Sequence, residues 1–434
     1  MIETITYGVT AAIAILIPGL YIYKNTKQKQ QAERRLHESV SKGLTEPLSL
    51  HPVIDPTKCI GTAACVPPCP EGEILGVLNG SAKLVSPTKC IGHGACEAAC
   101  PVEAISLVFG TERRGVELPF LKPNFETNVP GIFIAGELGG MGLIRNAVTQ
   151  GCEALDYMNE TIQTHPSDVY DVAIIGAGPA GLSASLEAQK LGLRSITLEQ
   201  DDIGGTILSY PRQKLVMTQP MEIPLYGKVK VREIVKEDLL SLWHDVIRKT
   251  GLNIHTKERV ESVQRSNGYF TVTTTQNQWR AQRVLLAIGR RGTPRKLGVP
   301  GEKSSKVVYR LLEPAQYLKK KILVVGGGDS AIEAALALAE QRGTDVTLSY
   351  RKNVFSRIKE KNQQRIENAM RQDRVNVLLE SNVLEIQREH VRLTRGDEQF
   401  ELKNDYVFIF IGGVLPTAFL QKMGVSIVKK FGER

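Results

Sequence analysis

Short apolar runs separated by amphipathic segments predict alternating strands and helices through residues 170–412. The apolar run Val172–Ile175 is typical of a buried strand, Leu182–Leu191 has the pattern of a helix, and Ser195–Leu198 is a second buried run. Sheet strands are also predicted over 268–275 and 280–288. Strands that alternate with helices in this order favour an α/β fold with parallel sheets.

The same strand–helix–strand pattern recurs about 150 residues later in the chain. Lys321–Val325 predicts a strand that leads into a helix, and Asp345–Ser349 predicts the second strand of the unit. The charged segment 354–374 predicts an exposed helix, and Tyr406–Ile411 predicts a closing strand. We therefore expect two Rossmann-like, three-layer dinucleotide-binding domains.

The turn of the first unit has the composition that a pyrophosphate needs. Gly176, Gly178 and Gly181 lack Cβ atoms, and the helix that starts at Pro179 and Ala180 offers free N–H groups to an anion. Glu199 follows the second strand, where an acid hydrogen-bonds a ribose hydroxyl. The alternative is an ordinary glycine-rich turn without a ligand.

The second turn suggests a different nucleotide. Its motif residues are Gly326, Gly328, Asp329, Ser330 and Ala331. After the second strand the chain carries cations instead of an acid, which suits the 2′-phosphate of NADP better than the bare ribose of NAD. These cations are Arg351, Lys352 and Arg357. The alternative is a solvated basic face.

The N-terminal segment Ile5–Tyr23 contains no charged residue and is long enough for a helix across a bilayer. Basic residues follow at once, so the positive-inside rule predicts a single-pass anchor over 1–24 with the remaining domains on the cytoplasmic side. The alternative is a buried N-terminal helix. Residues 25–52 are predicted to be a helical or flexible linker.

Charge and cysteine usage narrow the function classes. The net charge of +9 is modest and partly concentrated in the basic segment after the predicted anchor, so we do not expect nucleic-acid binding. Six of the seven cysteines lie between Cys59 and Cys100, and none follows Cys152. This clustering predicts a metal site in a reducing compartment rather than scattered disulfides.

An internal repeat surrounds these cysteines. Pro56-Thr-Lys-Cys-Ile-Gly61 recurs as Pro87-Thr-Lys-Cys-Ile-Gly92, and each copy continues to two further cysteines and ends in Cys-Pro. The repeat resembles the bacterial two-cluster ferredoxins, whose motif is C-x₂-C-x₂-C-x₃-C-P. The resemblance implies a small α+β domain over 53–110 that binds two iron–sulfur clusters.

The second cysteine of each ferredoxin motif is missing, with Thr62 and His93 in its place. By the resemblance, Cys59, Cys65 and Cys100 hold one cluster, and three thiols hold the other. The latter are Cys69, Cys90 and Cys96. Three thiolates suit a 3Fe–4S centre, or a 4Fe–4S centre with one other ligand. His93 is either that ligand or a bystander, and a decayed domain without clusters is a further alternative.

The segment 110–160 resembles the last strand and helix of the FAD domain in thioredoxin reductase-like flavoproteins, through Asn128–Glu137 and Arg145–Cys152. In those proteins this part closes the chain, whereas here it precedes the first Rossmann strand. We therefore expect a circularly permuted FAD domain. The expected division is 111–165 for the permuted FAD part, 166–295 for the FAD domain, 296–412 for the NAD(P) domain and 413–434 for the return to the FAD domain.

The same resemblance implies further FAD contacts outside the first glycine turn. These are Gly136, Glu137, Arg145, Asn146, Ala147, Gly204, Gly205 and Thr206. No side chain is expected to act as an acid or base at the flavin.

Together these features predict an FAD-dependent NAD(P)H oxidoreductase that exchanges electrons with iron–sulfur clusters and, through them, with a partner. The partner is a membrane redox complex, a quinone or a soluble carrier. The sequence leaves the oligomeric state open between a monomer and a homodimer, the state that is common among the relatives implied by the resemblance. Because no redox-active cysteine pair lies in the NADP domain, the clusters are the expected exit for electrons. The alternatives are a disulfide reductase that uses an external dithiol and a non-catalytic membrane redox sensor.

Overall fold

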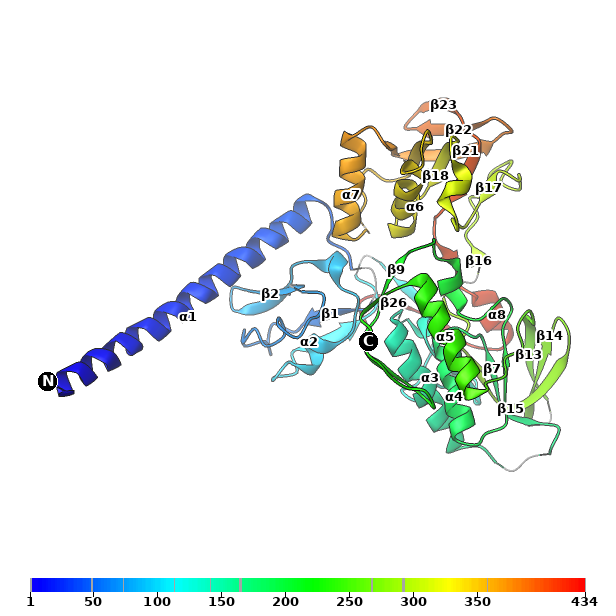
Figure 1. Cartoon of the computed structure of the whole chain (residues 1–434), viewed down its shortest axis with the longest axis horizontal. Coiled ribbons are helices and arrows are strands. Elements are labelled where there is room, and N and C mark those ends of the chain that lie inside the picture. Colours follow the sequence, from blue (N-terminus) through cyan, green and yellow to red (C-terminus); the bar gives the residue numbers. More distant parts are fainter. Residues whose placement is uncertain are drawn as a thin grey trace. The chain divides into compact units, whose positions relative to one another are not determined.

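The structure is a computed structural model of the 434-residue chain. It describes residues 2–47, 50–72, 74–112, 114–140, 142–163, 166–266, 268–290, 293–356 and 358–433. The chain forms two compact units (Figure 1). One comprises Met1–Arg113, Phe355–Glu360 and Gly432–Arg434, and the other comprises Arg114–Val354 and Lys361–Phe431.

The first unit begins with one long helix, α1, over Ile2–Ser41. Its second half packs on the strands that follow it. Ala32 is buried against Leu78 and Val85, and the hydroxyl of Ser39 donates to the Val85 carbonyl oxygen at 2.8 Å. The close approach requires Gly76, since a Cβ at this position would lie 2.5 Å from that of Ala32.

The predicted membrane anchor is wrong. Across the ranges that the structure describes, we find no helix with both the length and the apolar character needed to cross a membrane. The localisation on the cytoplasmic side of a membrane and the attachment to that membrane both depended on this anchor, and they are wrong for the same reason. The charge-free run Ile5–Tyr23 does not stand alone, because the helix continues through the polar segment, which was expected to be a linker, up to Ser41.

The rest of the first unit is a small α+β domain built from the cysteine repeat. Strands β1 and β4 pair antiparallel, and β2 and β3 form a hairpin between them in sequence. Their bounds are His51–Ile54 for β1, Leu75–Leu78 for β2, Ser81–Leu84 for β3 and Ile105–Val108 for β4, with the short helices η1 over Pro87–Lys89 and α2 over Ala95–Ala98. Leu75, Ala82 and Ile105 form its core together with Cys65 and Cys96.

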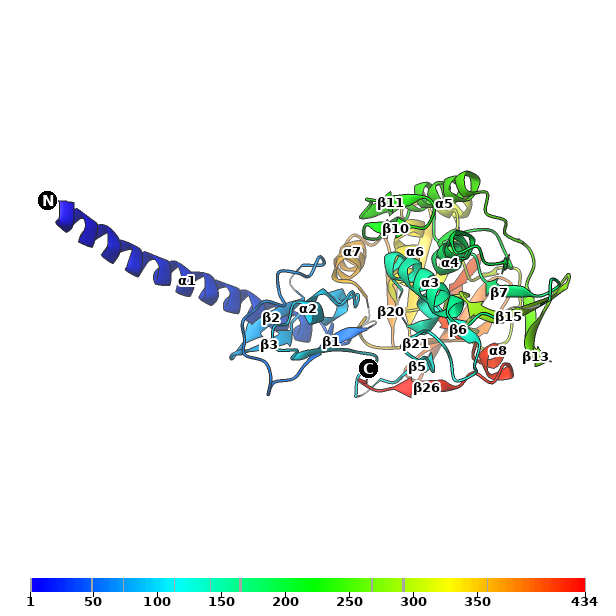
Figure 2. The same cartoon turned by 90° about the horizontal axis from the view of Figure 1, so that it is seen from below.

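In the second unit, one six-stranded sheet carries the first glycine turn. Its path is β13-β14-β15-β7-β8, and β6 also pairs with β15. The bounds are β6 Ile132–Ile134, β7 Tyr170–Ile175, β8 Ser195–Leu198, β13 Val260–Ser266, β14 Tyr269–Thr274 and β15 Gln278–Leu286. The helices α3, over Ile144–Asn159, and α4, over Pro179–Lys190, lie side by side in both views (Figures 1 and 2).

Segments from before the first Rossmann strand complete this sheet, as expected for a permuted domain. Strand β6 runs parallel to β15, with Val284 opposite Ile132. At the other end of the chain, β26 over Ile427–Lys430 pairs with β5 over Val116–Pro119 (Figure 2). Beyond these strands, Phe109 and the segment Gly432–Glu433 exchange backbone hydrogen bonds of 2.8 and 2.9 Å. The C-terminal segment thus returns to the part that precedes β6.

The second glycine turn belongs to a parallel sheet with the order β17-β24-β18-β19-β20. Its strands are β17 Val307–Val308, β18 Lys321–Val325, β19 Asp345–Tyr350, β20 Asn376–Leu379 and β24 Tyr406–Ile409, and its helices are α6 Asp329–Ala339 and α7 Glu360–Arg371. An antiparallel sheet of β21 Ser381–Ile386, β22 His390–Arg395 and β23 Glu398–Lys403 completes this domain.

The second unit also contains shorter elements and one further long helix outside these sheets. They are η2 Glu137–Gly139, η3 Gly205–Ser209, β9 Leu215–Met217, β10 Met221–Ile223, β11 Gly227–Val229, β12 Glu233–Val235, α5 Lys236–Thr250, β16 Thr293–Pro294, η4 Pro314–Tyr317, β25 Gly413–Val414 and α8 Thr417–Lys422. Strands β16 and β25 pair where the chain passes between the two sheets in each direction.

The close packing of α3 on α4 gives a test of the permuted domain. A Cβ at Gly151 would lie 2.3 Å from both the Ala180 carbonyl oxygen and the Ser183 hydroxyl oxygen. We expect Gly151→Ala to lower the free energy of unfolding by about 1–3 kcal/mol and to loosen FAD, because the two helices must separate. Urea unfolding followed by flavin fluorescence measures both effects. Thr149→Ala, on the exposed side of α3, is the control, and equal midpoints for the two variants would contradict this packing role.

Candidate functional site

The first turn requires glycine at two positions, Gly176 and Gly181, for different reasons. Gly176 has φ +106°, and a Cβ there would lie 2.5 Å from the Ala287 carbonyl oxygen. A Cβ at Gly181 would lie 1.8 Å from the Gly176 carbonyl oxygen, so this glycine lets α4 approach the strand. Gly178 instead faces Gly205, whose own Cβ would come within 3.1 Å of the Gly178 Cα. The two turns therefore present bare backbone to each other, which suits a pyrophosphate.

Glu199 stands at the end of β8 beside this turn. Its side chain is only 6% exposed, and its carboxylate accepts hydrogen bonds from the backbone N–H groups of Ala177, at 2.7 Å, and Asp201, at 2.9 Å. Its main chain is fixed as well, since its N–H donates to the His255 carbonyl oxygen and its carbonyl oxygen accepts from the Glu258 N–H. The acid is thus held next to the helix N-terminus.

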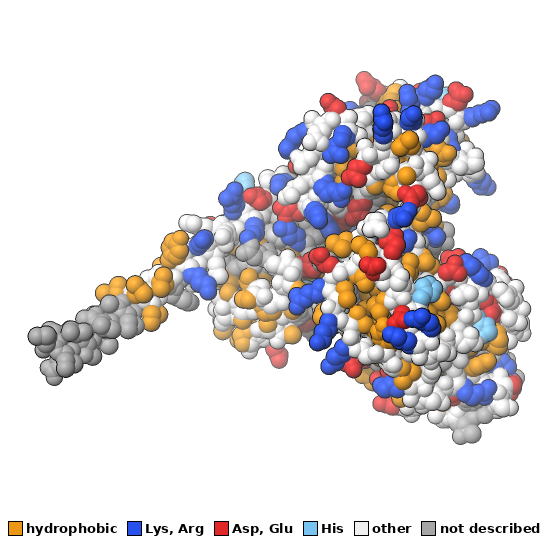
Figure 3. All heavy atoms as spheres, in the orientation of Figure 1, with side chains coloured by type: hydrophobic (Ala, Val, Ile, Leu, Met, Phe, Trp, Pro, Cys, Tyr) orange, Lys and Arg blue, Asp and Glu red, His pale blue; other side chains and the backbone are white. Residues whose placement is uncertain are grey.

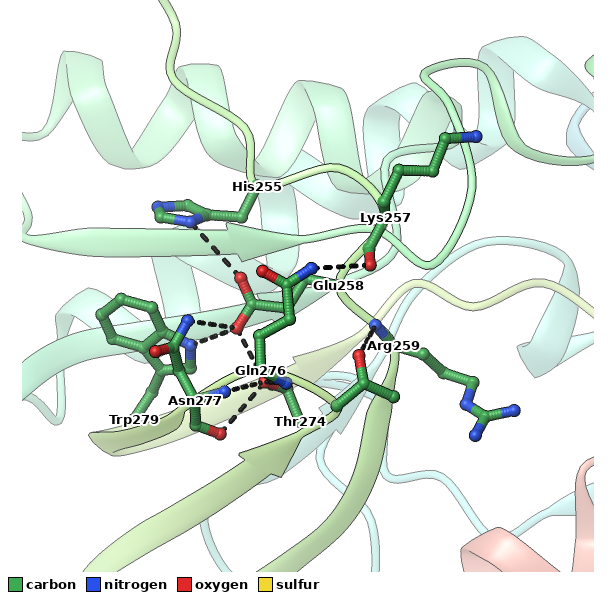
Figure 4. Close-up of polar contacts among 9 residues, drawn as sticks. His255, Lys257, Glu258, Arg259, Thr274, Gln276, Asn277 and Trp279 are labelled. Carbon is green, nitrogen blue, oxygen red and sulfur yellow. Dashed lines mark hydrogen bonds and ion pairs between the residues drawn. The ribbon is translucent and has the colours of Figure 1, made fainter.

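The buried carboxylate of Glu258 lies close to the end of β8, and its backbone is bonded to that of Glu199 (Figure 4). Glu258 is 2% exposed and accepts hydrogen bonds from the Trp279 indole at 2.8 Å, the Thr274 hydroxyl at 2.7 Å and the Asn277 amide at 3.3 Å. Its other oxygen lies 3.4 Å from Nδ1 of His255. Burial raises the pKa of Glu258, but these hydrogen bonds outweigh burial and hold the pKa below its usual value.

Two of the residues predicted in the segment before β7, Gly136 and Ala147, lie close to the first glycine turn. Gly136 has φ +84°, and a Cβ there would lie 3.0 Å from the Ala180 Cβ and 3.7 Å from the Ala147 Cβ. The Gln150 side chain fixes this approach by accepting from the Gly136 N–H at 2.9 Å. Arg145 instead reaches Gln219, with Nη1 2.6 Å from the amide oxygen.

The other residues of the first predicted set lie near these elements. Glu137 begins the helix η2, Asn146 lies in α3, Gly204 precedes η3, and Thr206 lies within η3. The hydroxyl oxygen of Thr206 would lie 3.8 Å from a Cβ at Gly289.

The second turn has the same backbone requirement. Gly326 has φ +149°, and a Cβ there would lie 2.3 Å from the Phe410 carbonyl oxygen and 3.0 Å from the Ala331 Cβ. A Cβ at Gly328 would meet nothing within 4 Å, which leaves open space at the N-terminus of α6. Asp329 and Ser330 follow as the first residues of that helix.

Asn362 fixes two acids on α6. Its amide donates to Oδ1 of Asp329 at 2.7 Å and to Oε1 of Glu333 at 3.1 Å. Lys214 lies 2.8 Å from the other oxygen of Glu333. The polar chain therefore joins the segment after η3 to the helix of the second glycine turn.

Two of the three predicted cations after β19 lie in solvent. Arg351 and Lys352 are both exposed, whereas Arg357 lies outside the described residues. The face drawn in Figure 3 carries many Lys and Arg side chains over this domain. Exposed guanidinium and ammonium groups at the end of β19 are available to an anionic ligand.

The six thiols of the repeat all lie in the small α+β domain of the first unit, and three of them share one cavity. Cys69, Cys90 and Cys96 line one cavity, which His93 also lines. The other walls of that cavity are Pro52, Glu71, Ile74, Leu75, Ile91, Gly92, Gly94 and Leu107. Burial is the main cause that raises the pKa of Cys90, to about 11.

The other three thiols, Cys59, Cys65 and Cys100, form the second group that the repeat predicts. Burial first, and then the charges of Cys96, Cys59 and Cys100, raise the pKa of Cys65 to about 11. Backbone N–H groups donate to two of the sulfur atoms, from Ala82 to Cys59 at 3.4 Å and from Ala104 to Cys100 at 3.2 Å. For Cys59, burial raises the pKa, but hydrogen bonds from the backbone outweigh it and the pKa is lowered.

This donor set fits iron–sulfur clusters better than a single metal ion. Three sulfurs around one cavity, and N–H groups directed at the sulfurs of the other group, are the surroundings that such clusters use. In the part of the chain that the structure describes, no three His, Cys, Asp or Glu side chains stand close enough to share one ion. Thiolates that bind different irons of a cluster stand farther apart than ligands of one ion, so the two findings agree.

Cys152 is separate from these groups. It lies in α3, and burial is the main cause that raises its pKa to about 12. A thiol of this kind is protonated near neutral pH and is a poor nucleophile.

Comparison with known proteins gives the family of the second unit. The family model of the pyridine nucleotide-disulphide oxidoreductases matches residues 173–432, which is more than half of the chain. The chain belongs to this family. A model of the 4Fe-4S dicluster domain matches residues 51–101, so the flavoprotein is fused to a ferredoxin domain. The chain is thus an FAD- and NADP-dependent oxidoreductase with iron–sulfur clusters.

Individual relatives cover the second unit. The chain is 28% identical to bacilliredoxin reductase Bdr of Bacillus subtilis over 60% of its own length and 82% of that protein. It is 30% identical to ferredoxin--NADP reductase of Streptococcus thermophilus, over 56% and 73% of the two chains. The solved structure of bacillithiol disulfide reductase Bdr from Bacillus cereus matches with a TM-score of 0.56 and 30% identity, over 59% and 82%.

Three supporting residues were not predicted from the sequence: Glu258, Gln150 and Asn362. Each acts through a contact between segments that are distant in sequence or on different elements, so no local motif marks it. The feature that marks these residues is the burial of a charged or amide side chain. Burial becomes visible only once the fold is known.

The support given by Glu258 can be tested by its pH dependence. Because the pKa of Glu258 is lower in the folded chain than the usual value of about 4.3, its stabilisation is present above that value and is lost as the pH falls through the folded pKa. We expect Glu258→Gln to lower the free energy of unfolding by about 1–3 kcal/mol at neutral pH and by less in acid. Urea titrations at several pH values measure this difference. A constant difference at every pH would show that shape, rather than charge, matters here.

Proposed function

We propose that this protein passes electrons from NADPH through its flavin to the clusters of its own ferredoxin domain, and from there to a one-electron carrier. The observation that carries this proposal is the grouping of all six repeat thiols in that domain, together with the lack of any cysteine after Cys152. A second unit without a cysteine pair needs another outlet for electrons. The fused ferredoxin domain is the outlet that the chain itself supplies.

The residues that we propose to hold FAD come from both parts of the permuted domain. Gly178 and Gly205 leave backbone room for the pyrophosphate, and Glu199 receives the adenosine ribose. Gly136 and Ala147 lie against the start of α4. The remaining members of this proposed set are Gly176, Pro179, Ala180, Gly181, Glu137, Arg145, Asn146, Gly204 and Thr206.

For NADP we propose the second turn and the cations that follow β19. The open backbone at Gly328 suits the pyrophosphate, and Arg351 and Lys352 suit the 2′-phosphate. For the clusters we propose the two groups of three thiols. The flavin, when bound, supplies the conversion between the two electrons of a hydride and the single electrons of iron–sulfur centres.

A second candidate is reduction of an external disulfide. The similarity to Bdr of Bacillus subtilis favours it, because that relative is a bacilliredoxin reductase. In this alternative the ferredoxin domain would be dispensable for turnover. The similarity to ferredoxin--NADP reductases, which exchange electrons with an iron–sulfur protein, favours the first proposal.

Stopped-flow mixing with NADPH separates these candidates. In Cys90→Ser we expect flavin reduction to change by less than about twofold, while electron transfer to an external one-electron acceptor falls by about tenfold or more. The reason is that the substitution removes a proposed cluster thiolate and leaves both nucleotide turns intact. Cys152→Ser is the matched control and should behave like the wild type.

Other outcomes would overturn the proposal. Rapid NADPH oxidation with disulfide substrates, unchanged in Cys90→Ser, would establish the second candidate. Flavin that NADPH reduces only slowly, with no electron reaching the clusters, would indicate a redox sensor. Flavin that neither NADPH nor NADH reduces would exclude both enzymatic candidates.

The proposed 2′-phosphate contact is tested by Arg351→Ala. A charge-assisted contact to phosphate contributes about 1.5–3 kcal/mol, so we expect the KM for NADPH to rise by roughly 10- to 150-fold while that for NADH changes little. Steady-state kinetics with both nucleotides measures this split. Arg342→Ala, an exposed arginine between α6 and β19, is the control. Equal losses with NADPH and NADH would count against 2′-phosphate recognition at Arg351.

A further inference from the structure

In both copies of the cysteine repeat, the residue just before the second motif position is a glycine with a positive φ. In the first copy Gly61 has φ +68°, and a Cβ there would lie 2.4 Å from the Gly80 carbonyl oxygen. In the second copy Gly92 has φ +76°, and a Cβ would lie 2.5 Å from the Leu50 carbonyl oxygen. Each glycine is therefore fixed by close backbone contact. Thr62 and His93 therefore each follow a glycine held in the same conformation.

The side chains at this position differ in their surroundings. Thr62 is exposed, and its hydroxyl oxygen accepts from the Ala64 N–H at 3.4 Å within its own turn. His93 lines the same cavity as the thiols Cys69, Cys90 and Cys96, and its Nε2 atom is buried. The imidazole thus belongs to the wall of a thiol-lined cavity, whereas the threonine faces solvent.

We propose that Nε2 of His93 is the fourth protein ligand of the second cluster, which is then a four-iron cluster held by three cysteines and one histidine. The first cluster, with exposed Thr62 at the matching position, is a three-iron cluster. Imidazole is an accepted ligand of iron and replaces cysteine in other iron–sulfur centres. This inference rests on the proposed function only in requiring that the repeat binds clusters.

The assignment makes the two clusters chemically unequal. A neutral imidazole in place of a thiolate removes one negative charge from the second cluster, and less negative charge makes a cluster easier to reduce. The first cluster lacks both the fourth iron and the fourth protein ligand. The repeat therefore yields two different electron acceptors from two nearly identical loops.

Matched substitutions at the two positions test the ligand directly. We expect His93→Ala in the full chain to contain one iron fewer per flavin than the wild type and to show a second three-iron EPR signal in the oxidised protein. His93→Cys should keep the wild-type iron content. Thr62→Ala should change neither the iron content nor the EPR spectrum, and Thr62→Cys should convert the first cluster to a four-iron form.

Isotope labelling of the wild type gives a readout that depends neither on the folding of a variant nor on NADPH. The full chain is labelled with ¹⁵N-histidine, reduced with dithionite and measured by pulsed EPR. We expect a histidine nitrogen coupling to one reduced cluster in the wild type and in Thr62→Ala, and its loss in His93→Cys. Absence of that coupling in the wild type, or its persistence in His93→Cys, would overturn the assignment.

The failure of this inference is distinguishable from the failure of the proposed function. Dithionite-reducible clusters without nitrogen coupling would refute the histidine ligand and leave electron transfer from NADPH intact. A nitrogen coupling with clusters that NADPH cannot reduce would refute the electron path and leave the ligand in place. A chain that holds flavin but neither iron nor sulfide after reconstitution would refute both.

Discussion

The parallel pairing of β6 with β15 is the interaction on which the second unit depends. Strand β15 pairs with β7 and β6 along its last residues and with β14 along its first, so it joins three segments of the chain. The strand β6 and the helix α3 come from before the first glycine turn, yet they complete the layer around it. Without this pairing, Gly136 and Ala147 would have no reason to lie beside the N-terminus of α4.

This arrangement explains how a ferredoxin domain can precede the flavoprotein in one chain. The pairing of β26 with β5 fixes the two ends of the second unit to each other, and Phe109 pairs with Glu433 in the first unit. The segment between Val108 and Val116 is short, so the ferredoxin domain is held at a high effective concentration. In the proposed electron path, the covalent link to the ferredoxin domain would avoid the cost in translational and rotational entropy that a separate carrier incurs at each encounter.

Motifs of a few neighbouring residues allowed the glycine turns and the cysteine repeat to be predicted from the sequence. Residues that act through contacts between distant segments could not be predicted in this way. Both glycine turns were recognisable because backbone clashes at Gly176 and Gly326 leave only one residue type possible. The cysteine groups followed from spacing and resemblance. The network around Glu258 was not foreseen, since its donors come from β14, β15 and the turn between them. The error at the N-terminus arose because an uncharged run was treated separately from the polar helix that it begins.

The thiols connect folding, cofactor loading and direction of electron flow. Burial keeps the pKa of Cys65 and Cys90 near 11, so these groups are protonated until iron replaces their protons. Cluster binding is therefore part of the stability of the ferredoxin domain. In the proposed assignment, the neutral imidazole of His93 removes one negative charge from the second cluster. A smaller negative charge raises the reduction potential of a cluster, which would favour electron flow from NADPH towards the second cluster.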